Sequence, residues 1–543
     1  MNIYFWGIII AMIIFIVIGI LVSRKVKNAE EFYVAGRNAP VILIAGSLVA
    51  SYASTGMFMG DAGTCYDGGF APVILLSGML SAGYIFGAVF FGRYLRRSKA
   101  YTMPEFFGKR FDSSAVRKLS AVTAIITMTV YLLSIMQGVG TLMEVITGVD
   151  YRICIIIAMV VFTIISVTSG SKGVLITDTL MAALFTIALV LGVVFVAKGT
   201  GGWYQSVENI AANTDTAALL SWTGKLGTLY DDKASTVLFG VIYGISWMSV
   251  CAIGPWQASR YQMAKNESVV IKSAFWSAIG VFMLQFLSGF AAVLVNLVYP
   301  DMAANESTTH VLIWASMNLM PKVLGIILLT GIFAAGISSA TTFQSLIGSM
   351  VVNDIVKVFD KNDTDSNMID KKAINIGRVV MIIAALAVTA VAVLNPPAIF
   401  IIMYFGGSII AGSWMPVAVA SVFSKRITKS GAFAGMLTGF VGTFAIKLFS
   451  YFLGWSLPIY LEPCFVGMIL NIIAIIVVSS LTKVTEKEAE AYKAMFVIPE
   501  SERDPVNIKK TINFVKGGCF VGAIAFVGML ILWIIPYMKG LAL

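Results

Sequence analysis

Residues 45–63 read AGSLVASYASTGMFMGDAG, an apolar stretch crowded with glycines and small hydroxyl residues. Small residues in a membrane span let neighbouring helices pack closely. They also favour a helix that breaks at the bilayer midplane, where the freed carbonyl oxygens can bind a cation. Taken alone, the stretch allows both interpretations.

A second stretch, residues 236–255, has the same interrupted character. Its small, aromatic and helix-breaking residues are Gly240, Gly244, Trp247, Gly254 and Pro255. Each of the two stretches opens a group of five apolar spans, in residues 40–197 and 236–423. Interrupted helices in corresponding positions of two halves indicate an inverted repeat with a binding site near the midplane.

The composition predicts a chain that crosses a membrane many times. Of the 543 residues, 58% are hydrophobic and only 12% are charged, where a soluble protein carries about 25% charged residues. A helix needs about 20 apolar residues to cross the hydrocarbon core. The runs that meet this length are residues 3–22, 40–62, 72–92, 118–146, 152–169, 173–197, 236–255, 270–299, 321–350, 376–395, 398–423, 430–453, 457–481 and 513–537.

We therefore expect an all-α polytopic membrane protein with about 14 transmembrane helices. An N-terminal flanking helix and inner loop take residues 1–39, and the first five-helix repeat takes residues 40–197. An outer loop, residues 198–235, precedes the second repeat, residues 236–423. Flanking helices fill residues 424–543. The outer loop either caps the outer vestibule or is an ordinary connection.

The distribution of lysines and arginines predicts the orientation. Most of the 38 basic residues fall in segments that lie inside if the N-terminus is outside, as the positive-inside rule requires. With an even number of spans, the C-terminus is then outside too. The first apolar run is followed by Arg24, Lys25 and Lys27, which indicates a retained helix rather than a cleaved signal peptide. The net charge of +10 thus reflects topology beside membrane lipid, and no nucleic-acid partner is expected.

The inventory of reactive side chains disfavours an enzyme. The five cysteines are scattered, and the single histidine, His310, lies in a predicted outer loop. No pattern of a zinc cluster or a His-based catalytic triad is present.

A dense stripe of hydroxyl residues lies within the span 321–350. Its members on one helical face are Ser338, Thr341, Thr342, Ser345 and Ser349. Such hydroxyls often bond back to carbonyls of their own helix. They are also the oxygen ligands that a hard cation such as sodium prefers.

Asp178 is the third candidate, because an ionisable residue inside a span is costly and marks a functional site by default. A carboxylate facing Thr341 and Thr342 would form a second cation site. The same carboxylate could instead relay protons, so a proton-coupled carrier is the alternative interpretation.

In matching order along nearly the whole chain, these segments resemble the sodium/solute symporter family, which includes bacterial sodium/proline, sodium/pantothenate and sodium/galactose carriers. The segments that carry the resemblance are EFYVAGR at 31–37, the broken helix ending at Gly60, Tyr131 with Glu144, Thr177–Asp178, Gly254–Pro255 followed by Arg260, AAGISSATT at 334–342, Asn353–Ile355 and KRITKSGAFAGMLTG at 425–439.

The resemblance implies a LeuT-like core of two inverted five-helix repeats with flanking helices. It implies a main sodium site made by three carbonyls and two hydroxyls, those of Ala50, Ala53, Ala335, Ser338 and Ser339. A second sodium site would fall on Asp178, Thr341 and Thr342.

The resemblance also places the solute between the broken helices, near Tyr52, Ser54, Thr55, Tyr131 and Trp247. The proline carriers have an aspartate at the position of Tyr52, which weakens a proline assignment. The sugar carrier's polar groups are missing at Gly56 and Met57, which disfavours a sugar.

We therefore predict a sodium-coupled symporter of a bacterial plasma membrane that imports a small organic solute by alternating access, with sodium as the co-transported ion. The solute is expected to be an amino acid, pantothenate or a short monocarboxylate. A passive channel is disfavoured by the ion site at the broken helix. The sequence predicts no oligomeric state.

Overall fold

The computed structural model describes residues 3–23, 29–356, 366–394, 399–454 and 457–542. Within these residues the chain forms helices and no β-strand, with one isolated bridge between Ala39 and Ala264. Arg24, Lys25 and Lys27, on which the expectation of a retained first helix rests, lie outside the described residues.

The helices of the first half are α1 (Ile3–Ser23), α2 (Ala29–Val34), α3 (Val41–Tyr52), α4 (Ala62–Thr64), α5 (Phe70–Gly87), α6 (Arg93–Ser98), α7 (Met103–Arg110), α8 (Ser114–Thr147), α9 (Tyr151–Gly199), α10 (Trp203–Ala212), α11 (Lys233–Ile253) and α12 (Pro255–Met263). Those of the second half are α13 (Glu267–Val295), α14 (Met302–Asn305), α15 (Val311–Asn318), α16 (Lys322–Met350), α17 (Ser366–Ala392), α18 (Ile399–Phe423), α19 (Lys429–Leu453), α20 (Pro463–Leu481), α21 (Glu486–Phe496), α22 (Pro505–Met529) and α23 (Ile535–Leu541). Short 3₁₀ and π turns join them, at η1 (Ala35–Arg37), η2 (Gly56–Asp61), η3 (Cys65–Gly69), η4 (Ala88–Gly92), η5 (Ala217–Leu220), η6 (Thr308–His310), η7 (Val351–Val356), η8 (Ile459–Leu461), η9 (Glu500–Glu502) and η10 (Leu530–Ile534).

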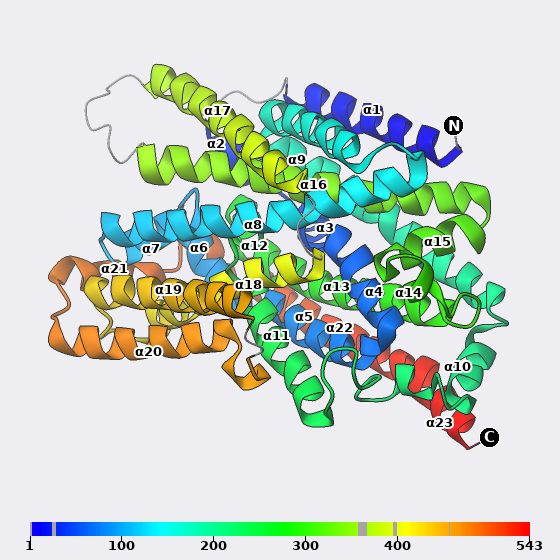
Figure 1. Cartoon of the computed structure of the whole chain (residues 1–543). Helices are drawn as coiled ribbons and strands as arrows, with labels where there is room; N and C mark the ends of the chain where they lie inside the picture. The colour runs from blue at the N-terminus through cyan, green and yellow to red at the C-terminus, as the bar shows by residue number, and fades with distance from the viewer. Residues whose placement is uncertain (1–2, 24–28, 357–365, 395–398, 455–456, 543) are drawn as a thin grey trace.

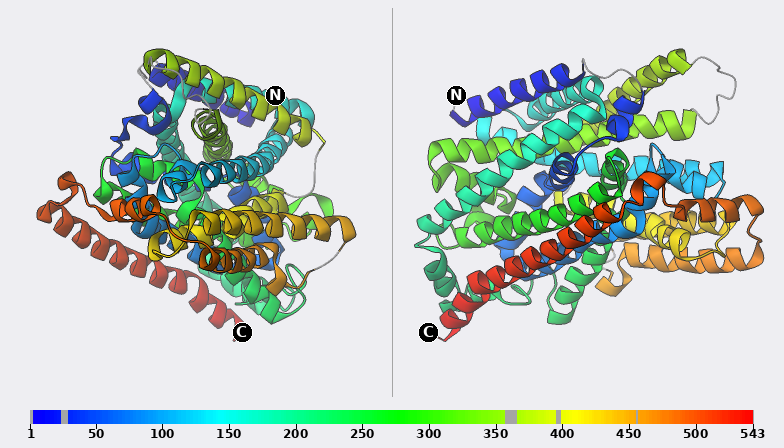
Figure 2. Two further views of the ribbon diagram at one scale, coloured as in Figure 1. Left: turned by 90° about the vertical axis from the view of Figure 1, so that its left-hand side faces the viewer. Right: turned by 180° about the vertical axis from the view of Figure 1, so that it is seen from behind.

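The long helices lie side by side in one bundle (Figure 1). Helix α1 begins and α23 ends at the same end of this bundle, together with α10 and α14, while α6, α7 and α21 lie at the opposite end (Figure 1). Helix α22 crosses the back of the bundle diagonally (Figure 2, right). The arginine-rich helix α6 thus lies at one end of the bundle, and the first residues of α1 and the last of α23 lie at the other.

The number of membrane spans agrees with the expected value of about 14. Within the described residues, 12 helical segments are long and apolar enough to cross a membrane, and two shorter apolar helices, Ile3–Ile18 and Val41–Tyr52, accompany them. Two details differ from the expectation. The predicted span 40–62 ends as a helix at Tyr52, because the chain leaves the helical conformation at Ala53. The predicted spans 152–169 and 173–197 both belong to α9.

Close packing between α5 and α11 depends on glycine. A Cβ atom added to Gly83 would lie 2.4 Å from the carbonyl oxygen of Met248, and one added to Gly87 would lie 2.6 Å from the Cα atom of Ala252. Both distances are shorter than van der Waals contact, so a side chain at either position would force the backbones of α5 and α11 apart. The absence of side chains lets these two helices approach each other, as small residues do in membrane proteins.

We expect Gly83→Ala to destabilise the folded protein by about 1–3 kcal/mol, because the new methyl group must push two helices apart. The matched control is Gly78→Ala on the same helix, where the nearest atom to a new Cβ lies 3.8 Å away. Melting temperatures of the two variants in detergent check this. Equal melting temperatures would show that α5 and α11 separate without cost.

The predicted outer loop 198–235 is ordered and packs against the C-terminal helices. The indole of Trp203 stacks on Phe290 with ring centroids 4.4 Å apart, and its Nε1 donates to the carbonyl of Leu532 at 2.8 Å. Trp533 in turn donates to the carbonyl of Leu220 at 3.1 Å. The loop is therefore a packed layer, and its role as a cap over a vestibule stays a prediction.

Candidate functional site

The first helix of the predicted repeat is broken at its centre. Helix α3 ends at Tyr52, and Ala53 takes an extended conformation with φ −62° and ψ 98°. The last carbonyls of a helix lack partners within that helix. The break therefore frees backbone oxygens at the end of α3, where Ala50 and Ala53 are both fully buried. In the other half, the chain breaks in the same way at Gly254, between α11 and α12.

Helix α16 lies beside the break in α3. A Cβ atom on Gly336 would contact the side chain of Thr55 at 3.5 Å, and α16 packs against α3. Ala335, Ser338 and Ser339 of this helix are all buried. The hydroxyl of Ser339 has no hydrogen-bond partner among the described residues. A buried hydroxyl without a partner is costly, and a cation that binds oxygen would compensate it where α16 packs against α3.

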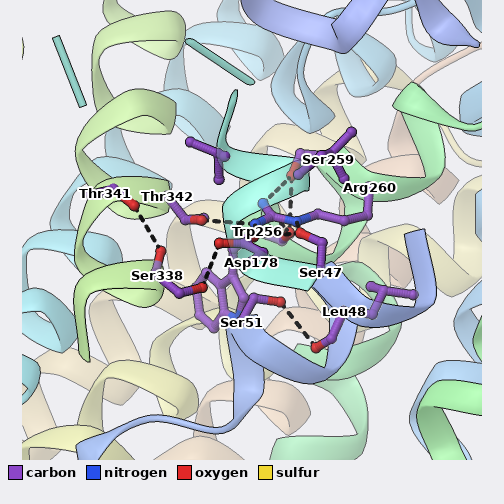
Figure 3. Close-up of polar contacts among 12 residues, drawn as sticks. Ser47, Leu48, Ser51, Asp178, Trp256, Ser259, Arg260, Ser338, Thr341 and Thr342 are labelled. Carbon is purple, nitrogen blue, oxygen red and sulfur yellow. Dashed lines mark hydrogen bonds and ion pairs between the residues drawn. The ribbon is translucent and has the colours of Figure 1, made fainter. Parts of the chain in front are cut away.

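Asp178 of α9 accepts three strong hydrogen bonds (Figure 3). Ser338 donates to its Oδ1 at 2.6 Å, while Ser47 and Arg260 Nη2 donate to its Oδ2 at 2.5 and 2.8 Å. The carboxylate is fully buried. Its negative charge is therefore balanced by a guanidinium and held by two hydroxyls. Ser338 connects this carboxylate to the predicted main sodium site.

Arg260 of α12 lies where a second sodium ion was expected. The same Nη2 atom that binds Asp178 also donates to the hydroxyl of Thr342 at 2.7 Å. Thr341 bonds to the carbonyl of Ser338 at 3.1 Å, one helical turn away. In this conformation the cation shared by Asp178 and Thr342 is thus an arginine.

The remaining donors of Arg260 are also satisfied. Its Nε donates to Ser47 at 2.8 Å, and its Nη1 donates to Ser259 at 3.1 Å and to the carbonyl of Trp256 at 3.2 Å. Only 2% of this residue is exposed. In the sequence Arg260 lies between the predicted spans 236–255 and 270–299, where a basic residue would be expected in a loop, whereas the structure buries it on α12. A signal was present, because a buried aspartate requires a cation and Arg260 follows the helix break at Gly254.

The five residues predicted to contact the solute are all buried. Trp247 contacts two of the others: its ring centroid lies 6.2 Å from that of Tyr52 and 5.8 Å from that of Tyr131. The hydroxyls of Ser54 and Tyr131 are 3.4 Å apart. Thr55 instead donates to the carbonyl of Ile135 at 3.3 Å, which turns it toward α8.

Four residues beside this group were not identified from the sequence. Trp256 and Phe343 pack on Tyr131, with ring centroids 5.6 and 5.0 Å away. Gln285 accepts a hydrogen bond from Tyr52 at 3.2 Å, and Tyr404 stacks edge-on against Trp247 at 5.6 Å. Trp256 follows the break at Gly254 on α12, whereas the other three come from α13, α16 and α18, which no local pattern joins to the broken helices.

Two helices broken at the centre of a bundle, with a hydroxyl-bearing third helix beside one break, define the LeuT-like class of secondary transporters. The chain belongs to the sodium:solute symporter family, whose model matches residues 32–439. It is therefore a transporter and not an enzyme. As a member of this family it couples the symport of a small organic solute to sodium across the plasma membrane.

Curated relatives agree with this family over most of their length. The sodium/proline symporter of Salmonella typhimurium is 24% identical over 86% of this chain and 91% of its own. The osmoregulated proline transporter OpuE of Bacillus subtilis is 25% identical over 92% of this chain and 97% of its own. Among solved structures, a Na⁺-coupled sialic acid symporter in a substrate-bound outward-open state has a TM-score of 0.75 at 16% identity, covering 88% of this chain and 97% of that one. This last likeness concerns the fold alone.

Proposed function

We propose that this protein imports a small organic solute together with sodium, and that its main sodium site is formed by the carbonyls of Ala50, Ala53 and Ala335 and the hydroxyls of Ser338 and Ser339. The observation that carries the assignment is the unpartnered hydroxyl of Ser339 beside the break in α3. Sodium binding there satisfies that hydroxyl and the freed carbonyls, and it holds α16 against α3.

A second sodium ion binds at Asp178, Thr341 and Thr342 in a different conformation of Arg260. Two cations cannot share the Oδ2 atom of Asp178 and the hydroxyl of Thr342 at the observed distances of 2.8 and 2.7 Å. Sodium and the guanidinium therefore compete. Arg260 lies on α12, the second half of the helix that breaks at Gly254, and Trp247 lies on α11, its first half. A movement of Arg260 would therefore couple the sodium site to the helix that carries Trp247.

The proton-coupled alternative finds less support. Asp178 accepts hydrogen bonds from Ser47, Ser338 and Arg260, all of which act as donors. Such an environment stabilises the charged carboxylate. A proton relay requires a carboxyl group that gains and loses a proton during the cycle, and a proton on Asp178 would leave the buried guanidinium of Arg260 without its charged partner.

Alternating access follows from the two breaks. We place both termini outside, because α6 and α7, which carry Arg93, Arg96, Arg97, Lys109 and Arg110, belong to the inner end by the positive-inside rule. The repeats are proposed to cover residues 40–197 and 236–423. At about 100 mV, each sodium ion that moves inward contributes roughly 2.3 kcal/mol to solute accumulation.

The test is the melting temperature of the purified protein in sodium chloride and potassium chloride at equal ionic strength, with a panel of small organic acids, amines and amino acids. A ligand that binds the native state raises the melting temperature. We expect sodium to stabilise the protein, and at least one compound to stabilise it further in sodium only. If every compound that binds did so equally well in potassium, sodium coupling would be wrong.

A further inference from the structure

Asp61 of η2 is a buried carboxylate that the proposed cycle does not use. The five buried carboxylates of the described residues are Asp61, Glu105, Asp178, Asp354 and Glu488. Asp178 and Asp354 each pair with an arginine, and Glu105 pairs with a lysine. Glu488 accepts two backbone N–H groups. Asp61 pairs with no described lysine, arginine or histidine; the hydroxyl of Tyr404 lies 3.4 Å away, and the amide of Gln285 lies beside it without the geometry of a normal hydrogen bond.

Asp61 belongs to a ring of side chains that includes two of the predicted solute contacts. Tyr404 links Asp61 to Trp247, whose ring contacts Tyr52. Tyr52 donates to Gln285, and the amide of Gln285 lies beside Asp61 again. These five residues come from η2, α18, α11, α3 and α13, so the ring closes around the centre of the bundle next to the helix break.

This ring contains two buried donors that have no partner. Neither Nε1 of Trp247 nor Nε2 of Gln285 donates a hydrogen bond to any described residue. The ring therefore offers a ligand the carboxylate of Asp61 and the aromatic side chains of Tyr52, Trp247 and Tyr404. It also offers two N–H donors without a partner, one from Trp247 and one from Gln285. No positively charged side chain of the described residues pairs with its carboxylate.

We propose that the transported solute carries a positively charged ammonium nitrogen that binds against Asp61, and an oxygen acceptor that receives the donors of Trp247 and Gln285. A buried unpaired carboxylate is expensive, and an organic cation compensates it on binding. Aromatic faces attract ammonium groups. Zwitterions such as amino acids and betaines supply both groups. Pantothenate and short monocarboxylates would instead place a second negative charge beside Asp61.

A third sodium ion at Asp61 fits the ring less well. Sodium prefers a shell of several oxygen ligands, whereas the unpartnered groups of this ring, Nε1 of Trp247 and Nε2 of Gln285, are N–H donors that cannot bind a metal ion. The organic cation is therefore the assigned occupant. This inference rests on the proposed function, because it names the solute of the same carrier.

The experiment uses the full-length protein with Asp61→Asn and the matched control Asp67→Asn. Asp67 lies on the same segment but is only half-buried, and it accepts a hydrogen bond from Thr308 at 3.0 Å outside the ring. Melting temperatures are measured in sodium and in potassium with three probe classes. These are zwitterions (amino acids and glycine betaine), plain cations (alkylamines and choline), and anions that lack a cationic nitrogen (acetate, propionate and pantothenate).

We expect a zwitterion to stabilise the wild type in sodium, the anions to have no effect, and Asp61→Asn to weaken the affinity about a hundredfold. Asp67→Asn should keep the affinity of the wild type. Sodium alone should stabilise Asp61→Asn as it stabilises the wild type. Asp61→Asn should also fold, because it removes an unpaired buried charge.

Three results would overturn the inference. One is a ligand from the anion class, or no ligand among the ammonium compounds. Another is an Asp61→Asn variant that binds the solute like the wild type. The third is loss of the stabilisation by sodium alone in Asp61→Asn, which would make Asp61 a sodium ligand. If a plain cation were the best ligand, the proposed oxygen acceptor at Trp247 and Gln285 would be wrong, and only the contact between the ammonium group and Asp61 would stand. Binding that is equal in potassium contradicts the proposed function instead, whatever Asp61→Asn does.

Discussion

Asp178→Ala is expected to destabilise the folded protein by about 3–5 kcal/mol, the largest effect among the substitutions considered. The change removes the counter-charge of Arg260, which is only 2% exposed. A buried charge that loses its partner retains its full desolvation cost. Melting temperature in potassium chloride measures the effect without a contribution from sodium binding.

Two further variants separate this effect from a general sensitivity to losing an aspartate. Asp301→Ala removes an exposed carboxylate from α14's N-terminal side and should leave the melting temperature nearly unchanged. A double variant, Asp178→Leu with Arg260→Met, removes both charges and should recover much of the stability, because apolar side chains can replace a buried ion pair. If Asp178→Ala behaved like Asp301→Ala, the ion pair would not hold α9 against α12.

Ser339→Ala is expected to reduce the affinity for sodium tenfold or more, corresponding to about 1.5–3 kcal/mol for one oxygen contact to a charged ion. The same variant should be as stable as the wild type in potassium, or slightly more stable. The reason is that the Ser339 hydroxyl is buried without a partner, so its removal loses no hydrogen bond. Sodium titrations of melting temperature and of solute uptake measure both parts.

The control for Ser339→Ala is Ser345→Ala, which removes another buried hydroxyl from the same helix. It should leave the sodium titration unchanged. A loss of stability in potassium for Ser339→Ala would mean that the hydroxyl bonds within the protein. An unchanged sodium titration would remove Ser339 from the sodium site.

The class of protein, the approximate number of spans and the broken helix could be predicted from the sequence because they depend on local properties. Hydrophobic length determines whether a segment crosses a bilayer. The glycines and hydroxyls of residues 45–63 bracket the break that occurs at Ala53. The hydroxyl stripe was predictable because helical periodicity alone places Ser338 and Thr342 on one face.

The partners of the buried charges were decided only by the tertiary structure. Arg260 and Asp178 are 82 positions apart in sequence, and Asp61 and Tyr404 are 343 apart. From the sequence alone, Arg260 near the end of a span is interpreted as a positive-inside residue, and Asp61 near the outer end of a span is interpreted as part of a loop. Which of them becomes buried depends on how α3, α9, α12 and α18 pack. Burial determines whether a charge is solvated or must find a partner, and therefore where this carrier can bind its ions and its solute.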